Sequence, residues 1–206
     1  MPRLSLNKTE LKKQRDALQR FQRYLPLLQL KKQQLQAEVE RVRREQARVR
    51  EATQRQREAV NGWVALLAEE VGLETLIALE RVEIRWDNIA GVPVPVFVQA
   101  HLCTAPYDLF VTPPWVDRAI ESLRALLALQ AEAVVLEEQL RRLARELRLT
   151  AQRVNLFEKI KIPEAQDNIR RLAIYLGDQQ TAAFGWALEA KRKLRALSAV
   201  GEAESP

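Results

Sequence analysis

The chain has 206 residues, of which 47% are hydrophobic and 6% aromatic, with only six glycines; this composition is typical of long helices and excludes a wholly disordered chain. The net charge of +6 is uneven, because residues 1–60 hold 16 Lys/Arg and 7 Asp/Glu, residues 61–114 hold 2 and 7, and residues 115–206 hold 15 and 13. The single cysteine excludes an internal disulfide, and we expect neither a signal peptide nor membrane insertion, because no run approaches the ~18 apolar residues of a membrane helix.

The first predicted element is a coiled-coil helix within residues 1–72. It opens at Asn7, and Glu10 follows three residues later, as in a capping box. A 3-4 spacing then continues in one phase for eight heptads, and 12 of its 17 positions are apolar. A 3.5-residue period predicts a left-handed supercoil with a partner helix. The stripe consists of Leu11, Gln14, Leu18, Phe21, Leu25, Leu28, Lys32, Leu35, Val39, Val42, Gln46, Val49, Thr53, Gln56, Val60, Trp63 and Leu67.

Two features interrupt this helix. Pro26 removes one backbone hydrogen bond, so we expect a kink near Gln22. The pair Asn61-Gly62 is a weak point, but the stripe keeps its phase beyond it. We therefore expect the helix to continue and to end near Gly72, which suits the position after a helix C-terminus.

Residues 73–114 follow a different pattern and predict a small insertion containing a β-hairpin. Apolar and polar residues alternate over Val82–Trp86, as in a half-buried strand. Residues Asp87–Gly91 have the composition of a turn. The prolines within Val92–Val98 favour an extended backbone, and the pattern allows a further short strand at Leu102.

Residues 115–206 predict the second coiled-coil helix. A stripe begins at Val116, Ile120, Leu123 and Leu127, slips in phase, and resumes as Leu136, Leu140, Leu143, Leu147, Val154 and Phe157. Pro163 should break the helix. A further stripe then runs from Ile169 to Lys193, and we expect Trp186, like Trp63, to be a core anchor.

These elements predict a mostly α fold. It is a long antiparallel two-helix left-handed coiled coil with the small hairpin-containing insertion between the helices. The insertion lets the chain reverse, so that the second helix buries its stripe against the first. Pairing within one chain avoids the entropy lost when two chains associate.

The sequence holds no catalytic, metal or cofactor-binding pattern. His101 is the only histidine, and with Cys103 it supplies two of the roughly four ligands that a zinc site needs. Glycine-rich phosphate loops are absent from the sequence. We therefore expect a non-catalytic protein without a cofactor.

Arginines crowd the first helix between residues 41 and 57, which leaves three interpretations open. Glutamates alternate with them at spacings that allow ion pairs, as on a solvated coiled-coil face. Contact with an acidic protein is the next interpretation. Nucleic-acid binding is the third, but the stretch lacks the aromatic residues that stack on bases. A free-standing coiled-coil scaffold or tether is a further alternative for the whole chain.

Three segments resemble the D subunit of the V-type/A-type rotary ATPases. Asn88-Ile-Ala-Gly-Val-Pro-Val-Pro-Val-Phe97 is similar to that family's Asn-(Val/Ile)-Ala-Gly-Val-x-x-Pro segment. Arg153-Val-Asn-Leu-Phe-Glu-Lys-Ile-Lys-Ile-Pro163 resembles its Arg-Val-Asn…Ile-Pro segment, and Asn7-Lys-Thr-Glu-Leu11 resembles the start of its bacterial members. The leader and the stretch from Tyr107 to Trp115 depart from the archaeal and eukaryotic pattern and indicate a divergent bacterial branch.

The resemblance implies a mechanical role at the cytoplasmic face of the membrane. In this family the D subunit is the axle of the central stalk, and rotation couples ATP chemistry to proton or sodium movement. Its implied partners are the catalytic and non-catalytic ring subunits, a small stalk companion and the funnel subunit that joins the membrane rotor. We expect a basic tip to face the ring, formed by Lys8, Lys12, Lys13, Arg15, Lys191, Arg192, Lys193 and Arg195. We expect the hairpin turn, formed by Asn88, Ile89, Ala90, Gly91 and Val92, to lie near the stalk partners.

Overall fold

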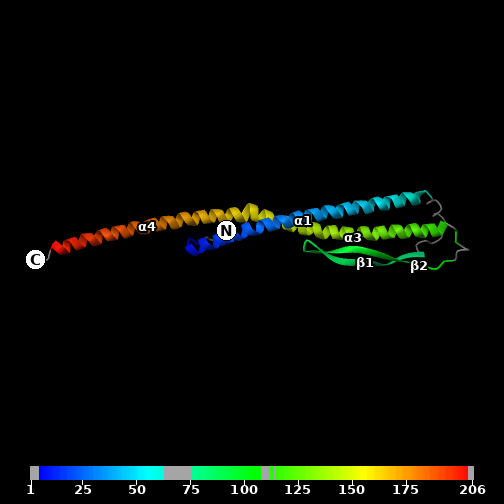
Figure 1. Cartoon of the computed structure of the whole chain (residues 1–206), viewed down its shortest axis with the longest axis horizontal. Coiled ribbons are helices and arrows are strands. Elements are labelled where there is room, and N and C mark those ends of the chain that lie inside the picture. The colour runs from blue at the N-terminus through cyan, green and yellow to red at the C-terminus, as the bar shows by residue number, and fades with distance from the viewer. Residues whose placement is uncertain (1–4, 63–75, 108–111, 114, 204–206) are drawn as a thin grey trace. The chain divides into compact units, whose positions relative to one another are not determined.

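The computed structural model describes residues 5–62, 76–107, 112–113 and 115–203. In chain order they form α1 (Lys8–Asn61), β1 (Ile77–Ile89), β2 (Val92–Thr104), α3 (Trp115–Leu156), the π-helical turn η2 (Phe157–Lys161) and α4 (Ile162–Ala203) (Figure 1). The described chain is mostly helical, with long helices before and after a two-stranded antiparallel sheet, which confirms the expected fold class.

The chain divides into two compact units. The terminal unit comprises Met1–Leu28 and Gln152–Pro206, and the hairpin unit comprises Gln29–Ala151. Helices α1 and α3 each contribute residues to both units.

Helix α1 begins where the capping pattern predicts. The backbone N–H of Glu10 donates to Asn7 Oδ1 over 2.7 Å, and the N–H of Leu11 donates to the Asn7 carbonyl over 3.1 Å. The first bond satisfies one of the donors that a helix N-terminus leaves free, and the second is the first regular bond of the helix. The Glu10 carboxylate accepts a hydrogen bond from Gln14 Nε2 over 2.9 Å, so it supports the helix through its next turn.

The stripe of α1 is confirmed over its described length. All fifteen stripe positions from Leu11 to Val60 are buried or half-buried, including the polar ones. Trp63 and Leu67 lie outside the described residues. The helix runs through Pro26 and ends at Asn61, ahead of the expected end near Gly72, which also lies outside the described residues. Gly62 forms a turn, in line with the weak helix propensity of Asn61-Gly62.

The hairpin turn is tighter than predicted. Ile89 pairs with Val92, so Ala90 and Gly91 alone connect the strands, with φ angles of 52° and 80°. Two positive φ angles define the turn whose twist matches that of antiparallel strands. The expected turn over Asp87–Gly91 was therefore too long, because residues 87–89 belong to β1.

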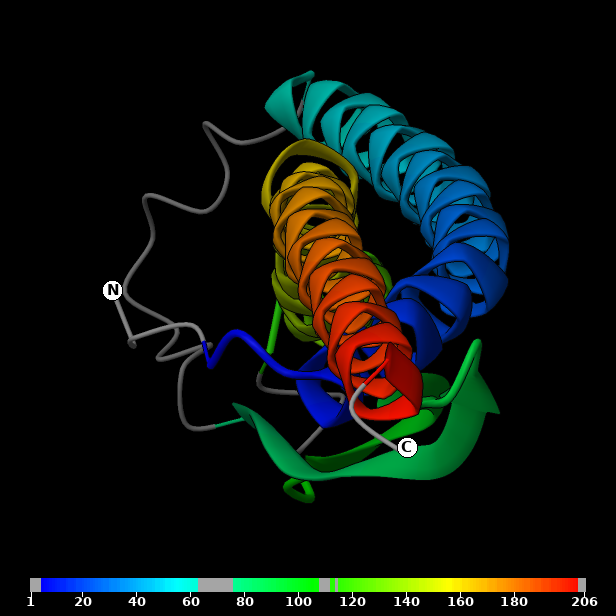
Figure 2. The ribbon, with the colours of Figure 1, turned by 90° about the vertical axis from the view of Figure 1, so that its left-hand side faces the viewer.

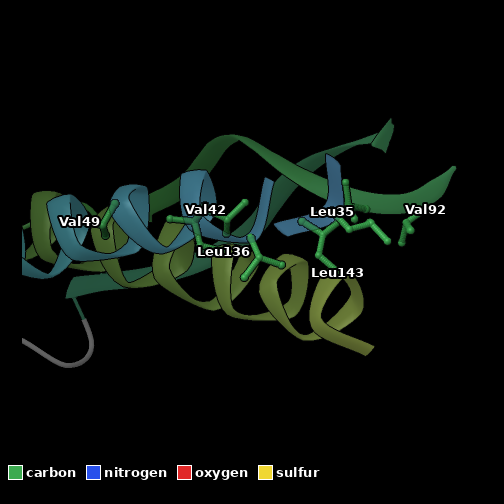
Figure 3. Packing of buried hydrophobic residues seen from close by; sticks show 8 residues of the cluster. Leu35, Val42, Val49, Val92, Leu136 and Leu143 are labelled. Carbon is green, nitrogen blue, oxygen red and sulfur yellow. The ribbon is translucent and has the colours of Figure 1, made fainter. Parts of the chain in front are cut away.

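In the hairpin unit, α1 and α3 run antiparallel and share one core with β2. Leu35, Val39, Val42 and Val49 of α1 contact a cluster that contains Leu136 and Leu143 of α3 and Val92 and Val94 of β2. Figure 3 shows Leu35 beside Leu143 and Val42 beside Leu136, so residue numbers rise on one helix as they fall on the other. Figure 2 shows the hairpin on one side of these helices.

The second long helical segment does not break at Pro163. The backbone N–H of Ile162 donates to the carbonyl of Phe157, five residues earlier, and this widens one turn into η2 before α4 begins. A proline lacks an N–H and crowds the carbonyl four residues earlier. The wider turn accommodates both effects, so the expected break becomes a π-bulge.

In the terminal unit, the returning segment covers the first part of α1. The rings of Phe21 and Phe157 lie 5.2 Å apart, and Leu172 of α4 is fully buried. Every described position of α4 from Gln179 onward is exposed, so the expected stripe ends at Leu176. The predicted core anchor Trp186 is wrong, because its side chain is 77% exposed.

Candidate partner-binding surfaces

The basic residues of α1 surround an open depression in the terminal unit. Lys8, Lys12 and Arg15 line it together with Leu11 and Asp16 of α1. Its other wall comes from α4, through the four residues Ala173, Leu176, Gly177 and Gln180. Lys13 is exposed and lies 3.9 Å from Glu10. This part of the predicted basic tip is therefore a cationic rim over an apolar floor.

The basic residues of α4 form a second and separate group. Lys191, Arg192, Lys193 and Arg195 are all exposed. Gln180, which lies beside the start of α1, precedes Lys191 by 11 residues, or roughly 16 Å of helix at 1.5 Å per residue. Figure 1 shows α4 continuing past the first turn of α1. The structure thus places the eight predicted residues on one unit, but in two groups along it.

Large apolar side chains are exposed between these two groups. Phe184, Trp186 and Leu188 are 75%, 77% and 67% exposed. Phe184 and Leu188 are four residues apart and share one side of α4, whereas Trp186 lies on another side. The sequence pattern did not reveal their exposure, because periodicity identifies an apolar stripe without showing where its partner helix ends.

The hairpin turn, predicted as a partner contact, packs largely against the helices. Val92 is buried in the shared core, and Ile89 and Ala90 contact the same cluster. Lys31 Nζ of α1 lies under the turn, 3.9 Å from the place that a Cβ on Gly91 would occupy. Only Asn88 and Gly91 of the five predicted residues are exposed.

One arginine of α3 holds the hairpin against the helix. The Arg142 guanidinium lies 4.8 Å from the centre of the Trp86 ring, and its Nη1 donates to the Pro93 carbonyl over 3.4 Å. Its Nε donates to Glu138 Oε1 over 2.6 Å, and Arg141 donates to the same carboxylate. Glu138 therefore orients the arginine that stacks on the hairpin.

This arrangement predicts a pH dependence. Hydrogen bonds from Arg141 and then Arg142 lower the pKa of Glu138 from 4.5 to about 2. Because the folded pKa is depressed, the stabilisation is complete above pH 4.5 and is lost as the pH falls toward 2. We expect Glu138→Gln to lower the midpoint of unfolding at neutral pH, and the difference from the unmodified chain to vanish near pH 2.

Denaturant titrations from pH 2 up to neutral pH measure this effect. Glu137→Gln is the matched control, since Glu137 is the exposed neighbour on the same helix. A constant difference between the Glu138→Gln variant and the unmodified chain at every pH would contradict the assignment.

The open end of the hairpin is also tied to α3. The Tyr107 hydroxyl donates to Asp117, which raises the pKa of Tyr107, and Arg124 donates to Thr104 Oγ1. Contacts with α3 thus hold the hairpin at its turn end, through Arg142, and at its open end, through Arg124. A separate ion pair links the two helices, with Lys31 Nζ of α1 3.0 Å from Glu146 Oε1 of α3.

The described residues contain no group of three or more His, Cys, Asp or Glu side chains that could hold a metal ion. His101 Nε2 instead lies 3.2 Å from Glu83 Oε2 across the two strands, and Cys103 is exposed. Within the same described part of the chain, no helix combines the length and the apolar character needed to cross a membrane.

Comparison with known proteins gives a consistent family. The family model for the D subunit of ATP synthase matches residues 10–192. The V-type ATP synthase D subunit of Borreliella burgdorferi is 43% identical over 183 residues, which cover 89% of this chain and 91% of that protein. The proteins of the same name from Chlamydia pneumoniae and Chlamydia abortus are 32% and 33% identical, over 97% and 93% of this chain and 97% and 94% of their own lengths.

These three relatives are bacterial, in agreement with the branch that the sequence motifs indicated. The region matched by the family model includes all of β1 and β2 and the Arg-Val-Asn…Ile-Pro segment. Of the predicted basic tip, Lys8 precedes this region, and Lys193 and Arg195 follow it. The family model and the relatives each match most of the length of this chain. The chain therefore belongs to the family of ATP synthase D subunits.

Proposed function

We propose that this chain is the rotor axle in the central stalk of a V/A-type rotary ATPase. It transmits torque between the ring that hydrolyses or makes ATP and the membrane rotor that moves ions. The D subunit is a structural rather than a catalytic component. The observation that carries the proposal is the α1 seam, which is covered in each unit by the chain's own returning helix.

The physical basis is resistance to twisting. A single helix bends and twists easily, whereas two helices that interdigitate along a seam can turn only by moving packed side chains past one another. In the hairpin unit this seam is apolar and fully buried at Leu35 and Leu143. Lys31 and Glu146 add an ion pair that links the two helices directly.

The outer face of α1 suits a part that turns beside other subunits. Its charges pair within the helix, through Arg41 with Glu38, Arg43 with Glu40, Arg48 with Glu45 and Arg55 with Glu51. Water solvates such a surface well, and the surface has few apolar groups to which neighbouring proteins could bind. These local pairs also support the solvated-face interpretation over nucleic-acid binding.

We assign each proposed partner to one of the two units. The ring subunits contact the terminal unit, where both basic groups and the exposed aromatic residues of α4 lie. The small stalk companion and the funnel subunit contact the hairpin unit, around Asn88 and the exposed residues of β1. The assembly acts at the cytoplasmic face of the membrane, and this chain has no direct contact with nucleic acid.

Affinity purification tests membership of the complex. We expect the tagged chain, expressed in its own cells, to co-purify with nucleotide-binding ring subunits in stoichiometric amounts. Recovery of the chain alone would instead favour a free-standing scaffold. A salt titration of binding to DNA or RNA covers the remaining alternative, since steep salt-dependent binding would count against the axle.

A further inference from the structure

Strand β1 has a long free edge. Among the described residues it pairs with β2 alone, over 13 residues without a proline. Ten of those 13 residues are exposed, and the exceptions are Ile77, Val82 and Ile89. An exposed edge strand of this length is a template for pairing with another strand.

The register shows which backbone groups face outward. The pair that flanks a two-residue turn, here Ile89 and Val92, exchanges both hydrogen bonds, and the bonding then alternates along the strands as far as a register shift between Glu83 and Ile84. Asn88 opposite Pro93, and Trp86 opposite Pro95, are therefore non-bonded pairs whose backbone groups point away from the partner strand.

Two contacts agree with this alternation. The Asn88 N–H donates to its neighbour Asp87 Oδ1 over 2.8 Å, and the Pro93 carbonyl accepts from Arg142 of α3. The outer edge of β2 thus lacks two N–H donors, at Pro93 and Pro95. The outer edge of β1 keeps the donors and acceptors of Ile84 and Trp86, whose side chains are 42% and 55% exposed.

The side chains of β1 are complementary to a reversed copy of themselves. One face carries Arg81, Glu83, Arg85 and Asp87, with alternating charge. If two β1 strands pair antiparallel about Ile84, Arg81 lies opposite Asp87 and Glu83 lies opposite Arg85. Charges on an edge strand usually prevent pairing because like charges meet, whereas here each charge meets its opposite.

The other face agrees in the same register. Ile84 lies opposite Ile84 of the second copy, and Val82 lies opposite Trp86, so apolar side chains meet. From Ile84 to Asn88 the residues with outward backbone groups are the even-numbered ones. The register shift between Glu83 and Ile84 places its extra residue, Val98, in β2, so the alternation along β1 continues to Val82, and the dimer register pairs even with even. The charged residues then occupy the non-bonded pairs, in which opposed side chains approach most closely.

We propose that the free chain forms a homodimer through antiparallel β1 edges in this register. The proposal concerns the chain outside its complex and does not depend on the axle function. A single charge change tests it. Arg85→Glu places two carboxylates opposite each other, at positions 83 and 85, twice in the symmetric dimer. We expect the dimer dissociation constant to rise at least about tenfold.

The exchange of both charges supplies the rescue. Glu83→Arg combined with Arg85→Glu restores opposite charges in both pairs, so we expect dimer formation to return. Arg118→Glu, an exposed change on α3, is the control for net charge. Sedimentation equilibrium of the full chain measures the unmodified protein and the three variants, with circular dichroism to establish that each is folded.

A disulfide tests the register itself. In the Cys103→Ser background, Ile84→Cys brings two thiols to the two-fold axis, where the Cα atoms of a hydrogen-bonded pair lie about 5.5 Å apart, within reach of a disulfide. We expect rapid interchain oxidation for Ile84→Cys and none for Val98→Cys on β2. A monomer at every concentration, failure of the charge exchange to restore the dimer, or equal oxidation of both cysteine variants would overturn the proposal.

Discussion

Replacing Leu143 with alanine should lower the free energy of unfolding by about 2–5 kcal/mol, the range for removing a fully buried leucine. Leu143 is 0% exposed and lies where α1, α3 and β2 meet, so its loss leaves a cavity that three elements surround. Denaturant titration followed by circular dichroism measures the change. Because the seam is the proposed route of torque, we expect the same substitution to lower the stall torque of the assembled motor.

Leu149→Ala is the matched control for this substitution. Leu149 lies on the same helix and is 39% exposed, so its truncation removes less buried surface and leaves no enclosed cavity. We expect a change below about 1 kcal/mol, as for surface substitutions. Equal destabilisation by the two variants would show that Leu143 does not occupy the core of the hairpin unit.

Reversing the charge of Lys191, Arg192, Lys193 and Arg195 to glutamate should weaken attachment of the axle to the ring. These residues lie on the part of α4 that extends past the start of α1 and are exposed. Four repulsive contacts in place of attractive ones should reduce binding to the isolated ring by at least about tenfold, equivalent to about 1.4 kcal/mol. ATP-driven rotation of the reconstituted complex should fall with it.

The two basic groups allow a sharper comparison. Reversal of Lys8, Lys12, Lys13 and Arg15 tests the group on α1 separately. Reversal of four other exposed basic residues of the terminal unit, Arg153, Lys159, Arg170 and Arg171, controls for the change in net charge. If this control impairs rotation as strongly as the α4 variant, the effect is one of overall charge and not of a defined tip.

The seam of α1 could be predicted from sequence because its cause is local. A helix that faces one partner along its length must repeat its buried positions every 3.5 residues, and the polar members Gln46, Thr53 and Gln56 are half-buried as that period requires. Thr53 satisfies its hydroxyl by donating to the Val49 carbonyl over 2.8 Å. Polar residues in the stripe were therefore consistent with the prediction.

The end of the pairing could not be predicted in the same way. The apolar period of α4 continues through Ala183 and Trp186, yet these positions are exposed, because α1 begins at Lys8 beside Gln180. Periodicity describes one helix, whereas burial depends on how far its partner reaches. Exposed aromatic residues at the end of such a stripe are better predicted as a partner contact than as core.

The hairpin, too, could be predicted from the sequence only in part. The alternation over Val82–Trp86, the turn composition of Asp87–Gly91 and the prolines of Val92–Val98 predicted two extended segments around a turn, and both strands are present. Their lengths, and the burial of Ile89, Ala90 and Val92 against α1 and α3, depend on tertiary packing that no local pattern encodes. As a result, the hairpin leaves much of β1 exposed, and at the turn only Asn88 and Gly91 are exposed.

Direct observation of rotation tests the central claim, that this chain is an axle. Cys103 is the only cysteine in the sequence and is exposed on β2, so it offers a single attachment point for a bead. In a reconstituted complex with the ring fixed to a surface, the bead should turn in one direction when ATP is added and stop when ATP is removed. A bead that stays still while the same complexes hydrolyse ATP would contradict the axle.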